Sequence, residues 1–204
     1  MKCIEFPNYG YVFDEMPDSV LSKVRSLCSA AKDYRMSHQH LLAGQLEEEY
    51  TININLVDPE VKEFVMSRAN EYAKRWNYLE SVRMNSSDCI LDMTHMWVNY
   101  QKKTEFNPLH NHGGLFSFVM WIDIPFSYEE EKEISNAKNS NRPQCGKFNF
   151  HYINMLGGIC SHPIEAKSGD FALFPAGLNH SVYPFYTSDG YRVSVSGNIC
   201  YITP

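Results

Sequence analysis

Three histidines in two short segments have the type and spacing of metal ligands. His110 and His112 lie in NPLHNHGG. In an extended backbone, residues two apart face the same side, so both imidazoles can point at one centre. His180 lies in GDFALFPAGLNHSVYPF, residues 169–185. Imidazole suits iron, zinc, copper and nickel. The three side chains together predict a three-histidine metal site, whereas the H-x-H pair alone would more often be two surface histidines.

The segment that precedes His180 has the composition of a sharp turn between two strands. Gly169 turns the chain into an apolar strand at 171–174, and Pro175 ends that strand because proline cannot donate to a ladder. Gly177 permits a turn with positive φ. We expect His180 to open the next strand, with its ring directed at the mouth of a barrel.

Arg192 lies on a segment whose polar and apolar residues alternate. Arg192, Ser194 and Ser196 alternate with two valines in YRVSVSGNI, so one face of the expected strand is polar. A guanidinium can bind a carboxylate through two parallel hydrogen bonds. This face therefore suits a small dianion inside a barrel; the alternative is that Arg192 pairs with a structural Asp or Glu.

Two families share parts of these patterns. The spacing G-x5-P-x-G-x2-H at 169–180 resembles the second signature of cupins, but Phe116 and Ser117 stand where cupins carry a Glu, and Pro184 stands where they carry an Asn. Residues 40–200 are more similar to the 2-oxoglutarate/Fe(II) oxygenase superfamily, including small members from bacteria and from viruses of cyanobacteria. The matching segments are WVNY (97–100), LHNH (109–112), FSFVMWIDIP (116–125), LFPAGLNHSVYPF (173–185) and YRVSVSGNI (191–199).

The resemblance implies a specific enzyme site. His110, His112 and His180 would bind Fe(II), although the superfamily usually carries a carboxylate at the position of His112. Arg192 and Ser194 match the R-x-S pair that holds the far carboxylate of 2-oxoglutarate. Tyr100 would either offer a further hydroxyl to this cosubstrate or only pack in the barrel.

The resemblance also implies a reaction: oxygenation, by hydroxylation, of an unknown substrate with O2, releasing succinate and CO2. The alternatives are a cupin-type metalloprotein that does not use 2-oxoglutarate, such as a three-histidine dioxygenase or a zinc enzyme, and a binding barrel without catalysis.

The elements that must position these residues follow an α+β pattern. Helices are expected at 17–36 and at 58–77, where Asp58 is a candidate N-cap, and a strand at 47–56. From residue 89 onward, short strands are divided by Gly, Pro and Asn. We expect one domain, 1–204, in which 1–88 is a mainly helical support and 89–204 is a double-stranded β-helix, a jelly-roll or cupin-like barrel with the helices packed on one sheet.

The segment 127–145 is polar and poor in apolar residues. It is expected to be either a solvated loop or a mobile lid over a pocket.

Five further histidines carry weaker signals. His95, His151 and His162 are expected to be packing or surface residues, and His38 and His40 could reach the rim of the pocket.

Composition narrows the class of protein. The formal charge of −6 argues against nucleic acid and against an anionic membrane surface as partners. No apolar run approaches the roughly 18 residues of a membrane span. The six cysteines form no C-x-x-C pair, which favours reduced thiols and a cytoplasmic location, that of the host if the protein is viral. The expected partners are a small-molecule cosubstrate and an unknown primary substrate; a homodimer is left open.

Overall fold

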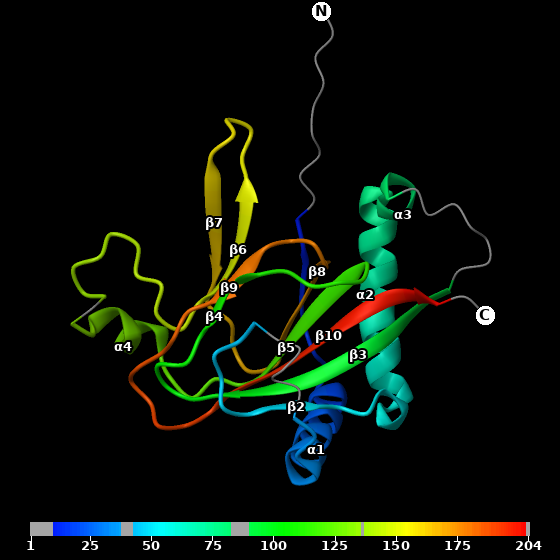
Figure 1. Cartoon of the computed structure of the whole chain (residues 1–204), viewed down its shortest axis with the longest axis horizontal. Helices are drawn as coiled ribbons and strands as arrows, with labels where there is room; N and C mark the ends of the chain where they lie inside the picture. Colours follow the sequence, from blue (N-terminus) through cyan, green and yellow to red (C-terminus); the bar gives the residue numbers. More distant parts are fainter. Residues whose placement is uncertain (1–9, 38–42, 83–89, 136, 203–204) are drawn as a thin grey trace, which may run out of the picture.

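A computed structural model describes residues 10–37, 43–82, 90–135 and 137–202 of the chain. Its strands form two antiparallel sheets (Figure 1). The six-stranded sheet has the order β1-β8-β5-β10-β3-β2, and the four-stranded sheet has the order β4-β9-β6-β7. The strands are β1 (Val12–Glu15), β2 (Glu49–Thr51), β3 (Ile90–Gln101), β4 (Asn107–His110), β5 (Phe116–Asp123), β6 (Phe148–Ile153), β7 (Ile159–Ile164), β8 (Asp170–Pro175), β9 (His180–Val182) and β10 (Arg192–Ile202).

The helices are α1 (Asp18–Tyr34), α2 (Pro59–Trp76), α3 (Tyr78–Ser81) and α4 (Tyr128–Glu133), and a 3-10 turn spans Ile54–Leu56. The two long helices form where the apolar spacing predicted them. In α2, Asp58 is the N-cap and accepts a hydrogen bond from the backbone N–H of Glu60. No helix in the described residues has the length and apolar character needed to cross a membrane.

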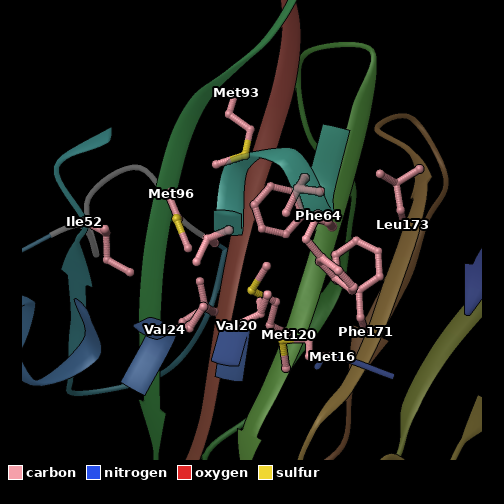
Figure 2. Close-up of a cluster of buried hydrophobic side chains, with 14 of the residues drawn as sticks. Met16, Val20, Val24, Ile52, Phe64, Met93, Met96, Met120, Phe171 and Leu173 are labelled. Atoms are coloured by element: carbon pink, nitrogen blue, oxygen red, sulfur yellow. The ribbon is translucent and has the colours of Figure 1, made fainter. Parts of the chain in front are cut away.

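The six-stranded sheet separates two hydrophobic cores. Its outer face packs against α1 and α2, and Figure 2 shows Val24 and Phe64 of these helices in one cluster with Met96, Met120 and Phe171 of the strands. Its inner face contributes to a second core, whose members include Val119, Trp121, Phe148, Phe150 and Phe174. Strand residues alternate between the two cores, as the period of a β-strand requires. This arrangement confirms the expected double-stranded β-helix with helices on one sheet.

The N-terminal segment contributes strands as well as helices. β1 and β2 form the two edges of the six-stranded sheet, by pairing with β8 and β3. The strand expected at 47–56 is shorter than predicted, because the side chain of Asn53 accepts a hydrogen bond from the N–H of Asn55 and starts the 3-10 turn. The division of a single domain at residue 89 stays a prediction.

Four cysteines lie in the described residues. Cys28, Cys145, Cys160 and Cys200 are all free. Cys3 and Cys89 lie outside the described residues.

Candidate metal and cosubstrate site

The structure brings the three predicted histidines together. His110 is the last residue of β4 and pairs in register with His180, the first residue of β9. The backbone N–H of His112 donates to the carbonyl of Ala176, in the turn that leads to β9. One ligand nitrogen from each ring lies within 4.8 Å of the others. Two neighbouring strand ends therefore aim three imidazoles at one point.

Backbone carbonyls fix the orientation of two of these rings. Nδ1 of His110 lies 2.8 Å from the carbonyl oxygen of Pro108, and Nδ1 of His180 lies 2.9 Å from that of Leu178. A carbonyl only accepts, so each Nδ1 carries the proton and each Nε2 keeps its lone pair. Nε2 of His180 lies 3.2 Å from Nε2 of His112. Donation of the second ring N–H to a backbone carbonyl, as at His110 and His180, is common among metal-binding histidines.

Burial keeps the three rings neutral. It lowers the pKa of His110, and it lowers the pKa of His112 to about 4. The pKa of His180 lies well below its ordinary value, first because of burial and then because of the neighbouring His110 and His112. Neutral imidazole is the form that binds metal. Three neutral nitrogen donors with no carboxylate among them fit a divalent transition-metal ion such as Fe(II) or Zn(II).

Aromatic side chains hold the histidine rings in place. The ring of His180 stacks on Phe148 at 5.3 Å between centroids, and the ring of His112 packs on Trp97 at 5.5 Å. Because Trp97 and Phe148 come from different sheets, the site lies between the two sheets.

The turn before His180 forms with one difference from the prediction. Gly169 has φ +100, as expected for the residue that turns the chain into β8. The expectation of a positive φ at Gly177 is wrong, because its backbone does not enter that region. The N–H of Leu178 instead donates to the carbonyl of Pro175 and closes an ordinary turn.

Arg192 lies in the cavity that the three histidines line, and Ser194 lies beside it. The side chain is 3% exposed, and Nη1 donates to the carbonyl of Gly146 at 2.8 Å. Nε has no hydrogen-bond partner, and Arg192 forms no ion pair with any carboxylate of the described residues. Burial lowers its pKa to about 10, so the group stays charged at neutral pH. A buried cation without a counter-ion is costly, which favours an anionic ligand over the structural Asp or Glu weighed above.

Tyr100 does not line this cavity, so of its two expected roles the structure favours packing over contact with the cosubstrate. Its hydroxyl donates to the carbonyl of Cys28 in α1, on the helical side of the sheet. The neighbouring Asn99 and Gln101 line the cavity instead, opposite Ser194 and Arg192. Successive side chains of a strand point to opposite faces, so Tyr100 points away from the cavity and packs among the helices.

Residues 127–145 are tied to the barrel. Glu131 of α4 is 1% exposed, and its carboxylate accepts hydrogen bonds from the N–H of Tyr186 and from the N–H and hydroxyl of Thr187. None of the described residues of this segment lines the cavity. The solvated-loop expectation is therefore corrected at α4, and the lid stays a prediction.

The other histidines that the structure describes do not line the cavity. His95 contacts Thr94, His162 contacts the hydroxyl of Tyr11, and His151 lies between two serine hydroxyls. His38 and His40 lie outside the described residues.

The fold is shared with solved oxygenases. A prolyl-4-hydroxylase from Pseudomonas putida superposes with a TM-score of 0.56 at 12% identity, over 93% of this chain and 91% of that chain. A Trichoplax adhaerens prolyl hydroxylase, solved in complex with a hypoxia inducible factor oxygen degradation domain peptide fragment, gives 0.56 at 11%, over 96% and 84%. The viral collagen prolyl hydroxylase of Paramecium Bursaria Chlorella virus-1, solved as a 2OG complex, gives 0.51 at 13%, over 94% and 96%.

Sequence comparison identifies the family. No curated protein matches the chain. The family described as "Putative 2OG-Fe(II) oxygenase" matches residues 95–198, about half of the chain, and this match includes the three histidines, Arg192 and Ser194. The chain therefore belongs to the 2-oxoglutarate/Fe(II) oxygenase family, whose cofactors are Fe(II), 2-oxoglutarate and O2.

Proposed function

We propose that this protein is a hydroxylase that couples the oxidation of a substrate C–H bond to the conversion of 2-oxoglutarate and O2 into succinate and CO2. The observation that carries the proposal is the buried, unpaired charge of Arg192 in the same cavity as three converging neutral imidazoles. Several solved proteins with this fold are named as hydroxylases, which supports the type of oxygenation.

Each part of the cavity has a separate task in this proposal. His110, His112 and His180 hold Fe(II), which when bound supplies the redox chemistry that activates O2. The open edge of Arg192, formed by Nε and Nη2, binds the far carboxylate of 2-oxoglutarate through two parallel hydrogen bonds, and the hydroxyl of Ser194 lies on the same strand face. The aromatic wall that includes Trp97 and Phe148 limits the access of water to the reacting atoms.

A metalloprotein that does not use 2-oxoglutarate is the second candidate, since His112 replaces the carboxylate usual in the superfamily. Such a protein would need the three histidines but would have no use for a buried, uncompensated Arg192. The two candidates therefore differ in one measurable property, which is the binding of 2-oxoglutarate next to the metal.

An anaerobic Fe(II) titration tests the proposal. Adding 2-oxoglutarate should produce the weak visible charge-transfer band of a chelated 2-oxo acid, and admitting O2 should then produce succinate. Glutarate is the matched control, because it keeps both carboxylates but lacks the keto oxygen, and it should give neither signal. Absence of both the band and succinate with 2-oxoglutarate would reject the oxygenase and favour the second candidate.

A further inference from the structure

Glu49 is a buried carboxylate for which the proposed reaction has no use. It lies on the edge strand β2, where its backbone pairs with Asn99 of β3. The side chain is 1% exposed, and neither carboxylate oxygen has a hydrogen-bond partner in the described part of the chain. Burial, and then the charge of Glu105, raise the pKa of Glu49 to about 7. A buried carboxylate without donors is costly, so its position calls for a ligand or another specific reason.

Glu49 does not itself line the cavity of the three histidines, but its Oε1 atom lies close behind Gly44, which does. Gly44 lines this cavity, and a Cβ on Gly44 would lie only 2.8 Å from Oε1 of Glu49 and 3.0 Å from Oδ1 of Asn107. The absence of a side chain at Gly44 thus brings both oxygens close to the cavity wall. Asn107 and Asn99 line the cavity themselves, and the Oδ1 atom of each is buried without a hydrogen-bond partner among the described residues.

The unpaired atoms of these groups are all oxygens that accept hydrogen bonds, whereas the NH2 group of Asn99 donates to Ser194. Two carboxylate oxygens and two amide oxygens without donors match a group with several N–H bonds and a positive charge, such as a primary ammonium or a guanidinium. On β10, which pairs with β3, Arg192 instead offers an unpaired donor, its Nε atom. The cavity therefore has an acidic end suited to a cation and a basic end suited to the carboxylate of 2-oxoglutarate.

We propose that Glu49, together with Asn99 and Asn107, binds a cationic nitrogen of the primary substrate, so that the substrate is an amine or a guanidine. The identification of this ligand as the primary substrate rests on the proposed function. The binding of the cation does not, because it depends only on Glu49 and its neighbours.

Calorimetry with paired probes tests this binding. The probes are Nα-acetyl-lysine methylamide and Nα-acetyl-arginine methylamide, and each is compared with its uncharged counterpart, the norleucine or the citrulline derivative. The titrations use the purified protein both without additions and with Mn(II) and 2-oxoglutarate. We expect at least one cationic probe to bind about 10- to 100-fold more tightly than its uncharged counterpart, as the loss of a charge-assisted contact implies.

Two variants test whether Glu49 causes the preference for the cationic probe. Glu49→Gln keeps the shape and removes the charge, so it should abolish the preference for the cationic probe. Glu48→Gln is the matched control: it removes one charge from the adjacent residue, whose carboxylate pairs with Lys32 and Tyr191. It should keep the preference. Because the side chain of Glu49 has no hydrogen-bond partner among the described residues, Glu49→Gln should also unfold at the same temperature as wild type or at a higher one.

Three results would overturn the inference: no preference for any cationic probe at millimolar concentration, a preference that survives in Glu49→Gln, or a Glu49→Gln protein that unfolds at a clearly lower temperature. The last would mean that Glu49 has a structural role. Failure of the oxygenase proposal is recognised separately, by the absence of succinate from 2-oxoglutarate, and it leaves these binding results unchanged.

Discussion

Replacement of Arg192 by Ala should weaken the binding of 2-oxoglutarate and leave the binding of metal intact. The side chain of Arg192 is buried, and its Nη1 atom donates to the carbonyl of Gly146. Its Nε atom has no hydrogen-bond partner among the described residues. The open edge can form two charge-assisted hydrogen bonds to a carboxylate. Their loss should cost about 2–4 kcal/mol. The dissociation constant of 2-oxoglutarate should therefore rise roughly 30- to 1000-fold.

The assay is a calorimetric titration of 2-oxoglutarate into protein loaded with Mn(II), which occupies the site without turnover. The same instrument measures the affinity for Mn(II) itself. Arg192→Lys should recover only part of the loss, because an ammonium cannot reproduce the two-pronged contact. Arg25→Ala is the matched control: Arg25 pairs with Asp123 and is half-exposed, and it does not line the cavity.

One result would refute the reasoning. If Arg192→Ala is folded by circular dichroism, binds Mn(II) as wild type does, and also binds 2-oxoglutarate within about threefold of wild type, then Arg192 is not the anchor. The buried charge would then need another explanation, and the second candidate function would gain support.

Three further predictions concern the metal and the barrel. His180→Ala should lower the affinity for Mn(II) or Zn(II), measured by calorimetry, at least tenfold, since one of three nitrogen donors is lost. His151→Ala should leave this affinity unchanged. Equal losses in both variants would contradict the assignment of His180 as a metal ligand. Metal affinity should be nearly the same at pH 6 as at pH 7, because burial lowers the pKa of all three histidines below the ordinary 6.5 and protons compete only at lower pH; a tenfold fall over this interval would argue against neutral, buried ligands. Glu131→Gln should lower the free energy of unfolding, measured by urea denaturation, by about 1–3 kcal/mol, because the carboxylate accepts buried hydrogen bonds from Tyr186 and Thr187. Glu129→Gln, at an exposed position on the same helix, is the control. Equal stability of the two variants would count against this role of Glu131.

Local patterns in the sequence were sufficient to predict much of the barrel. Apolar spacing and the Asp58 cap predicted α2, and the turn residues after Gly169 placed His180 at the start of a strand. These features depend on neighbours along the chain. The metal site could be predicted for the same reason, because its ligands sit at strand ends that carry strong turn signals.

The features that the sequence did not predict depend on contacts between distant segments. β1 is four residues long and is held by β8, so it has little signal of its own. The face on which Tyr100 lies depends on the register of β3 with β10, where Tyr100 pairs with Val193 and not with Arg192 or Ser194. Glu49 lies in the run EEEY, which is typical of a solvated segment. Its burial depends on pairing with β3 and on the approach of Gly44.

The central position of β10 has a consequence for the order of folding. β3 and β5 each pair with β10 and not with each other, and the facing residues Asn99 and Ser194 are 95 positions apart. Closing so long a loop costs entropy before the sheet gains stability, so we expect slow folding for a protein of this size. Until β10 is inserted, β3 and β5 expose open edges to which other chains could add. If Arg192 anchors 2-oxoglutarate as proposed, an intermediate without this strand also lacks that contact.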